Sequence, residues 1–514
     1  MIGISSPQEL TGARKITRKR VLTHAATSRW ALPLILAFQT LVSWLLLQNT
    51  AFQDEALYVY AGRQIWQAWL GGPPVTDPYS YYISGYPYVF PLIGGGLDLL
   101  GGIELARAFS LLCMLIATAC GYYIAKTLFH QKAAVFAALF FVCQGPVLFL
   151  SRLATYDPMC LCLLAISTAL AVHASQARRP WYALSVAPFL VLAFGAKYAA
   201  LLFIPEVIGI LILCTFLKWG WKSALLRGTL VLLAFALVGG VTAAIVLHFD
   251  PNMVHAVNAT TVNRSVNGIS SRLGLAEHVI SMVGLSFIIG LLGTVILARN
   301  KQFLIAAAFF ATSLLIPVYH IYKAEQISLD KHLGFSMFFL MPIAGYALSS
   351  LSGFGWRKLV LSGRYWMAGV SLCLILFLIG TGEAQTMYSS WASTSQLAYT
   401  MQTQVRPASG RYLAEQFEVS RYNLATDTFD WQWSGLDFFQ YTDAQGRYYV
   451  GNDAYAKAID DGYFDMIQLN YGYDLQTALF ISKAIEHSKR YTLIARIPYH
   501  SSYGPGFFWV WHKI

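Results

Sequence analysis

Long apolar runs separated by polar segments occupy residues 30–381. A sliding window of about 19 residues, the length of helix that crosses a bilayer, finds about eleven such runs. The runs centred near residues 188 and 207 are separated only by Gly195-Ala196-Lys197. This pattern predicts a mostly α-helical, polytopic membrane protein. The expected span centres are residues 39, 115, 141, 167, 188, 207, 236, 287, 311, 343 and 373.

The polar turns between these runs are of two kinds. Counted from a cytoplasmic N-terminus, the inner turns are short and basic, and the segment 1–29 before the first run is basic as well. The outer side instead has two long loops, residues 49–102 and 249–275. Because cytoplasmic loops carry the excess of Lys and Arg, we expect the N-terminus in the cytoplasm and the C-terminus outside. The inner basic residues are Lys126, Lys132, Arg178, Arg179, Lys218, Lys222, Arg227, Arg299, Lys301, Arg357, Lys358 and Arg364.

Residues 382–514 have a different pattern, polar and rich in Asp, Tyr and Trp, with no run long enough to span a membrane. Short β-like runs alternate with helical stretches, which predicts a small α/β domain on the outer surface. We interpret it as a lid or docking module, and the chain as a basic segment 1–29, a transmembrane domain 30–381 and this domain 382–514. The expected strands are Tyr422–Ala425, Met466–Leu469, Tyr491–Ile497 and Phe507–Trp511, and the expected helices are Ser395–Phe417 and Leu475–His487.

Composition supports the membrane class. Hydrophobic residues make up 56% of the chain and charged residues 12%, whereas soluble proteins carry about a quarter charged residues. The net charge of +11 belongs to the membrane part, because acidic residues outnumber basic ones in 382–514. We therefore expect no nucleic-acid partner. The seven cysteines lie in or beside apolar runs without metal-site spacing, so we interpret them as small packing residues.

Two carboxylates, Asp54 and Glu55, stand directly after the first apolar run. A charge left inside the bilayer costs about 2.5 to 3.5 kcal/mol, so we expect this pair at the outer surface, with a functional role. Residues 57–70 are amphipathic and rich in Trp and Tyr, which predicts a helix lying in the headgroup region. A paired acid at that height suits chemistry on a lipid-linked substrate. The same acids would also suit the first turn of the helix as capping residues.

Further charged residues gather on the outer side. Asp157 opens the fourth predicted span, and Lys197 lies in the turn between the fifth and the sixth. Transporters and flippases are an alternative class, but they often show internal repeats and charges near the bilayer midplane, and the sequence shows neither. Acids and bases on one face therefore favour an enzyme. The other outer cations considered are Arg264 and Arg272 after the seventh span and Lys331 and His332 before the tenth.

With these residues in this order, the chain resembles the GT-C glycosyltransferases, in the branch that holds the protein O-mannosyltransferases and the aminoarabinose transferase of lipid A. The resemblance covers nearly the whole chain in order and topology. The first outer loop departs from the aminoarabinose transferase, because Tyr88–Leu92 stands where that family has a Lys-Pro-Pro-Leu element. The resemblance is carried by Asp54-Glu55, by Asp157 within Arg152–Pro158, by Lys197 within Phe194–Pro205, and by the late span Lys331–Leu348.

The resemblance implies transfer of a sugar from a polyprenyl phosphate in the outer leaflet to an extracytoplasmic lipid, glycan or protein acceptor. It implies Asp54 as the general base, with Glu55 and Asp157 orienting the base or the acceptor. The leaving phosphate needs cations, and we expect Lys197 there, with Arg264, Arg272, Lys331 and His332 as weaker candidates.

Three expectations complete the interpretation. We expect no metal cofactor, although Asp54 and Asp157 would offer oxygen ligands to a divalent cation. A metal-dependent oligosaccharyltransferase or ligase is the second enzymatic interpretation. We expect a multi-pass protein of the bacterial inner membrane, with its C-terminal domain in the periplasm.

Overall fold

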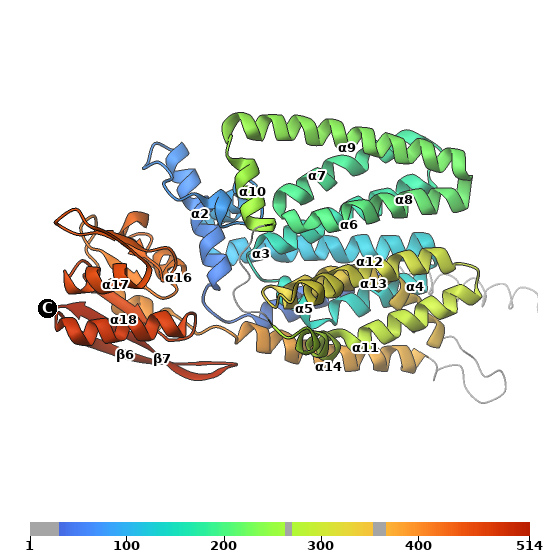
Figure 1. The fold of residues 1–514 in the computed structure, drawn as a ribbon. Coiled ribbons are helices and arrows are strands. Elements are labelled where there is room, and N and C mark those ends of the chain that lie inside the picture. Colours follow the sequence, from blue (N-terminus) through green and yellow to red (C-terminus); the bar gives the residue numbers. More distant parts are fainter. Residues whose placement is uncertain (1–29, 263–269, 353–365) are drawn as a thin grey trace, which may run out of the picture.

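The computed structural model describes residues 30–262, 270–352 and 366–514. The basic segment 1–29, Arg264 and the inner cluster of Arg357, Lys358 and Arg364 lie outside the described residues. Figure 1 shows two parts, a bundle of long helices and a smaller α/β domain at one end of it. The fold is therefore mostly α with a small C-terminal α/β domain, as the sequence predicts.

Eight helices within the described residues are long and apolar enough to cross a membrane, and three shorter apolar helices accompany them. Every span centre expected from the sequence falls inside one of these segments. The chain is a multi-pass membrane protein, and the number of spans stays a prediction. The shorter helices are Trp30–Leu46, α4 (Gln131–Val142) and the segment of η2 (Pro180–Ser185) and α7 (Val186–Ala196). The long ones are α3 (Phe90–Leu128), α6 (Tyr156–Gln176), α8 (Ile204–Trp219) with η3 (Tyr198–Leu202), α9 (Trp221–Phe249), α11 (Arg272–Arg299), α12 (Phe303–Lys323), α13 (Leu329–Leu351) and α14 (Trp366–Tyr388).

Helix α13 lies at the centre of the bundle. It packs against α3, α4, α5 (Gly145–Leu150), α11 and α12. In its most apolar stretch 89% of the residues are buried, whereas in that of the peripheral α9 only 6% are. The packing is close, because a methyl group at Gly345 would lie 2.4 Å from the backbone nitrogen of Ala137 in α4. Near the start of α13, the side chains of Lys331 and His332 are buried.

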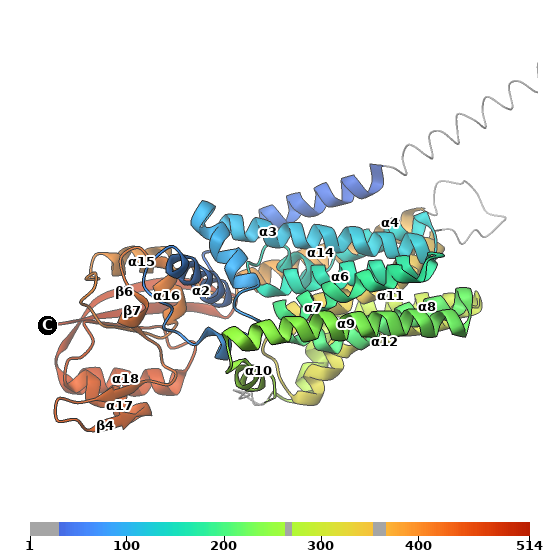
Figure 2. The ribbon, with the colours of Figure 1, turned by 90° about the horizontal axis from the view of Figure 1, so that it is seen from above.

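Helix α2 (Gln53–Trp69) lies at the end of the bundle that faces the C-terminal domain, together with η1 (Tyr79–Tyr81) and α10 (Met253–Thr261) (Figures 1 and 2). The helix expected over residues 57–70 is confirmed, but it begins earlier, at Gln53. Asp54 and Glu55 consequently lie in its first turn. The backbone N–H of Phe52 donates to the Glu55 carboxylate at 2.9 Å, so Glu55 does make the capping bond.

The C-terminal domain is built on a five-stranded mixed sheet in the order β2-β1-β5-β7-β6. Helices α17 (Gly451–Asp460) and α18 (Leu475–Ser488) pack together, and their apolar residues share a core with Ile467 and Leu469 of the sheet. The parallel strands are β2 (Trp433–Ser434), β1 (Tyr412–Ala414) and β5 (Met466–Leu469); β7 (Gly504–Lys513) runs antiparallel to β5 and to β6 (Tyr491–Ser501), and β3 (Gln440–Thr442) and β4 (Tyr448–Val450) form a separate hairpin.

Most of the elements predicted for this domain are present. The strands expected at Met466–Leu469, Tyr491–Ile497 and Phe507–Trp511 are confirmed as β5, β6 and β7, and the helix at Leu475–His487 is confirmed as α18.

Two predictions for the domain were wrong. Tyr422–Ala425 is not a strand, because α16 (Phe417–Asn423) covers its first half. The helix expected over Ser395–Phe417 ends at Gln402 as α15 (Ser395–Gln402), and β1 follows. Pro407 and Gly410 lie between them and are poor helix formers.

The domain contacts the bundle through α16, which packs on α2. Arg421 of α16 is buried, with its Nη1 2.5 Å from Asp77 Oδ2 and its guanidinium 4.5 Å from the centre of the Tyr60 ring. Burial raises the pKa of Tyr60 to about 12, so this ring stays neutral beneath the cation. The Tyr422 hydroxyl donates to Asp98 of α3 at 2.7 Å. These contacts connect the domain to both α2 and α3.

Candidate active site

Four elements bring charged side chains together at the end of the bundle nearest the C-terminal domain. We call this group of residues the acid–base cluster. It consists of Asp54 from α2, Asp157 from α6, Lys197 from the turn after α7, and Lys331 and His332 from α13.

The local backbone explains how two of these side chains are placed. Asp157 lies in the first turn of α6, where a carboxylate stabilises the positive end of the helix dipole, and Thr155 Oγ1 donates to its Oδ2 at 3.1 Å. Lys197 is extended, with φ −154° and ψ 127°, and it ends α7. This break between two apolar helices is where the sequence predicts it.

The turn that carries Lys197 is bound to the first long loop by its backbone. The N–H of Tyr198 donates to the Ser84 carbonyl at 2.9 Å, and the N–H of Tyr86 donates to the Gly195 carbonyl at 2.7 Å. Between them, a methyl group at Gly85 would lie 2.2 Å from the Ala196 carbonyl oxygen. Only glycine therefore permits this close approach of the two chains.

Asp157 forms the buried half of the cluster. Its carboxylate is fully buried and makes an ion pair with Lys197. Two further basic groups surround it, with Lys331 Nζ 3.7 Å from Oδ2 and His332 Nε2 3.6 Å from Oδ1. A buried carboxylate needs such partners, because an unpaired buried charge is strongly destabilising.

Asp54 forms the accessible half. Its side chain is 29% exposed, whereas that of Asp157 is 0% exposed. Lys331 makes an ion pair with Asp54 Oδ2 and so lies between the two carboxylates. Asp54 is therefore the acid of the cluster that a substrate can reach.

Glu55 has a different environment from its neighbour. Its carboxylate is fully buried and is bound by Arg107 of α3 at 3.0 and 2.7 Å. It also accepts the N–H of Ala154 at 2.7 Å, in addition to that of Phe52. Glu55 thus ties α2, α3 and the turn before α6 together, and it fixes the position of the first turn of α2.

Aromatic side chains lie beneath the cluster. The hydroxyls of Tyr58 and Tyr156 are 2.9 Å apart and their rings are stacked at 4.5 Å. The Lys197 ammonium lies 4.6 Å from the centre of the Tyr156 ring, within the range of a cation–π contact. The contact with Tyr156 restricts the movement of Lys197.

Two residues without a role predicted from the sequence contact this region. Arg107 holds Glu55, and His320 of α12 holds His332, with 2.9 Å between His320 Nε2 and His332 Nδ1. Both belong to helices that are long and apolar enough to span a membrane. Ionisable residues in such helices are rare, so the sequence marks both residues as unusual, although it does not show what they contact.

Two of the predicted phosphate-binding residues are not seen in the cluster. Arg272 is exposed at the start of α11 and donates to the Tyr322 carbonyl at 3.3 Å. Arg264 lies outside the described residues. Of the expected cations, the described structure brings together Lys197, Lys331 and His332. Within the described ranges, no three His, Cys, Asp or Glu side chains are grouped as metal ligands, and metal independence stays a prediction.

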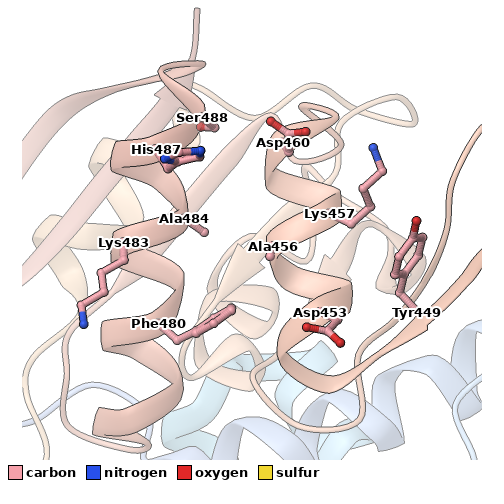
Figure 3. A pocket seen from close by; sticks show the side chains of 10 residues that line it. All are labelled: Tyr449, Asp453, Ala456, Lys457, Asp460, Phe480, Lys483, Ala484, His487 and Ser488. Carbon is pink, nitrogen blue, oxygen red and sulfur yellow. The ribbon is translucent and has the colours of Figure 1, made fainter.

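An open hollow lies elsewhere, between α17 and α18 of the C-terminal domain. Figure 3 shows Phe480 and His487 of α18 on one side of it and Asp453 and Asp460 of α17 on the other. None of the charged residues that line it is buried. The acid–base cluster has buried, paired acids and bases, which makes it the candidate active site.

Comparisons with known proteins agree with this architecture. The family model of dolichyl-phosphate-mannose-protein mannosyltransferases matches residues 87–243, which include Asp157 and Lys197. No curated protein matches the chain by sequence.

Solved structures match over nearly the whole chain. ArnT from Cupriavidus metallidurans in the apo state is 15% identical, with a TM-score of 0.61 over 94% of this chain and 98% of that chain. The same protein bound to undecaprenyl phosphate gives 14% identity and a TM-score of 0.63 over 94% and 97%. The apo oligosaccharyltransferase of Archaeoglobus fulgidus is 12% identical, with a TM-score of 0.56 over 93% and 74%. The chain has the GT-C fold of membrane glycosyltransferases.

Proposed function

We propose that this protein is a membrane glycosyltransferase that moves a sugar from a polyprenyl phosphate to an acceptor outside the cytoplasm. The observation that carries the proposal is the accessible Asp54 carboxylate held by Lys331 beside the buried Asp157–Lys197 pair. The GT-C fold supports it, as do the mannosyltransferase family match and a structural relative that binds undecaprenyl phosphate.

Asp54 is the general base of this proposal. The acceptor oxygen attacks the anomeric carbon, its proton passes to an Asp54 oxygen, and the bond from that carbon to the phosphate oxygen breaks. The phosphate leaves with the bonding electron pair, so the donor's sugar becomes a glycoside in one displacement. Lys331 orients the base for this attack, since it holds Oδ2 of Asp54 from one side.

Lys197 stabilises the charge that develops on the departing phosphate. It is a preorganised cation in a largely water-excluded position, where electrostatic stabilisation is strongest. Asp157 acts through the two lysines that it holds, and Glu55 acts through the position of α2. The space between the two acids is taken by the Lys331 ammonium, which supports a reaction without a divalent cation.

The second candidate is an oligosaccharyltransferase, because an archaeal enzyme of that kind shares the fold. Transport is not favoured, since the charges of the acid–base cluster lie at one end of the bundle rather than near its middle (Figure 1). Requirement for a metal ion separates the two enzymatic functions.

The test is turnover of a polyprenyl-phosphate sugar by purified protein, comparing the wild type with D54N, with and without EDTA. We expect release of polyprenyl phosphate that D54N lowers by about 10²–10⁴-fold, the usual contribution of a general base, and that EDTA leaves unchanged. Undiminished turnover in D54N would remove Asp54 from the chemistry. Loss of turnover in EDTA would favour the oligosaccharyltransferase.

A further inference from the structure

Behind Lys197, a line of hydrogen bonds runs through two histidines to a backbone carbonyl. Lys197 Nζ lies 2.6 Å from His332 Nε2, and His332 Nδ1 lies 2.9 Å from His320 Nε2. His320 Nδ1 then lies 2.7 Å from the carbonyl oxygen of Glu325, in the turn after α12. The three side chains are buried, so bulk water does not supply the partners of these nitrogens.

The carbonyl end of the line sets the position of every hydrogen. The Glu325 carbonyl oxygen can only accept, so His320 carries a hydrogen on Nδ1. The Lys197 ammonium beside His332 disfavours a further positive charge on either ring. In a neutral imidazole the other nitrogen is an acceptor, so His320 Nε2 accepts from the Nδ1–H of His332. His332 Nε2 is then an acceptor in its turn, and it faces the ammonium of Lys197, which can only donate.

This assignment fixes the direction of the Lys197 ammonium. An ammonium has three N–H groups, and those of Lys197 that point to Asp157 Oδ1 and His332 Nε2 determine where the remaining one points. With its hydrogen on Nε2, His332 would present a donor to a donor at 2.6 Å, and Lys197 would have to turn away. The tautomer of His332 therefore controls the orientation of Lys197.

We propose that His320 is a positioning residue of the transfer site, which fixes the tautomer of His332 and thereby the direction in which Lys197 presents its remaining N–H to the donor phosphate. The identity of the ligand as a donor phosphate rests on the proposed function. The tautomer is a property of the chain alone, and it can be measured without a substrate.

Two substitutions of His320 separate positioning from packing. H320F keeps a ring of similar size and removes both hydrogen bonds, whereas H320Q keeps an amide oxygen that can accept from His332 Nδ1–H. We expect H320F to lower kcat by about 10–100-fold, because a displaced catalytic group costs about that much, and to change the donor KM by less than about threefold. H320Q should restore most of kcat.

The control variant is H173Q. His173 is exposed on α6, its Nδ1 lies 2.8 Å from the Tyr123 hydroxyl, and its ring contacts that of Tyr182. Its substitution should leave kcat and KM unchanged. Thermal unfolding midpoints of all variants show whether a loss of turnover reflects a loss of fold.

The second readout is the ¹⁵N NMR spectrum of histidine-labelled protein, with the signals of His332 assigned by their loss in H332Q. We expect His332 protonated on Nδ1 in the wild type and a mixture of tautomers in H320F. A wild-type His332 protonated on Nε2 overturns the inference, and so does an equal loss, or no loss, of kcat in H320F and H320Q. If wild-type protein turns over no donor, the proposed function fails, and the NMR result alone decides the inference.

Discussion

Asp54 and Glu55 are neighbours in the chain with opposite surroundings. Asp54 faces a lysine and remains partly exposed, whereas Glu55 is enclosed by Arg107 and two backbone N–H groups. Successive residues of a helix point about 100° apart, which is why one acid can face the cluster while the next faces the interior of the bundle. At the scale of the residue, the pair combines the proposed general base with the structural group that fixes its helix.

This division of roles predicts the effect of E55Q. The substitution leaves the buried Arg107 without its main counter-charge, and breaking a buried ion pair costs about 3–5 kcal/mol. We expect a clearly lower thermal unfolding midpoint in detergent, and a smaller change in D54N, whose carboxylate is partly exposed. A wild-type midpoint in E55Q combined with lost turnover would contradict the structural role and make Glu55 a catalytic residue.

The sequence predicted five members of the cluster but gave no role to the two residues that hold their neighbours in place. Asp54, Asp157, Lys197 and the pair Lys331-His332 all stand at the ends of apolar runs, where a charge is conspicuous. The roles of Arg107 and His320 follow from the residues that they contact. Those partners, Glu55 and His332, lie 52 and 12 residues away in the chain. Such contacts depend on how the helices pack, which a hydropathy pattern does not contain.

At the scale of the element, the apolar helices were predictable and the short strands only in part. A span needs about 20 apolar residues, so its signal is strong. The strands β1 and β2 have three and two residues, too few for alternation to register, and neither was predicted. Tyr422 begins the run Tyr422–Ala425 that was expected to be a strand, although it lies on a helix and reaches α3.

The turn that carries Lys197 gives a prediction at this scale. In G85A the added methyl group would meet the Ala196 carbonyl, so the two backbone segments must separate and carry Lys197 with them. We expect turnover to fall about tenfold or more, because small displacements of catalytic groups have large effects. G209A is the matched control, since nothing lies within 4 Å of the added methyl on α8, and its turnover should be unchanged. Equal turnover in G85A and the wild type would show that the turn tolerates the shift.

At the scale of the whole molecule, the acid–base cluster and the C-terminal domain share one end of the bundle (Figures 1 and 2). The domain reaches α2 and α3 through the buried Arg421 and through Tyr422. The orientation proposed for the chain puts both outside the cytoplasm, where a lipid-linked donor and an acceptor can meet.

Labelling of an introduced cysteine tests this orientation. Tyr503 is 88% exposed at the tip of the β6–β7 hairpin, whereas the native cysteines are buried or half-buried. We expect Y503C in intact cells to react with a maleimide that does not cross membranes, and the wild type to react little. Reaction only after the cells are permeabilised would place the domain, and the cluster beside it, in the cytoplasm.

The ion pairs of the cluster have a consequence for the end of the reaction cycle. Lys197 and Lys331 are both matched by carboxylates, Asp157 and Asp54, before any phosphate arrives. An anionic donor must therefore share these ammonium groups with partners that the protein already supplies. In the proposed reaction Asp157 stays ionised, and Asp54 is ionised again once it has released the acceptor's proton. Both carboxylates then compete with the phosphate product for the lysines, which favours release of the spent lipid carrier over its retention.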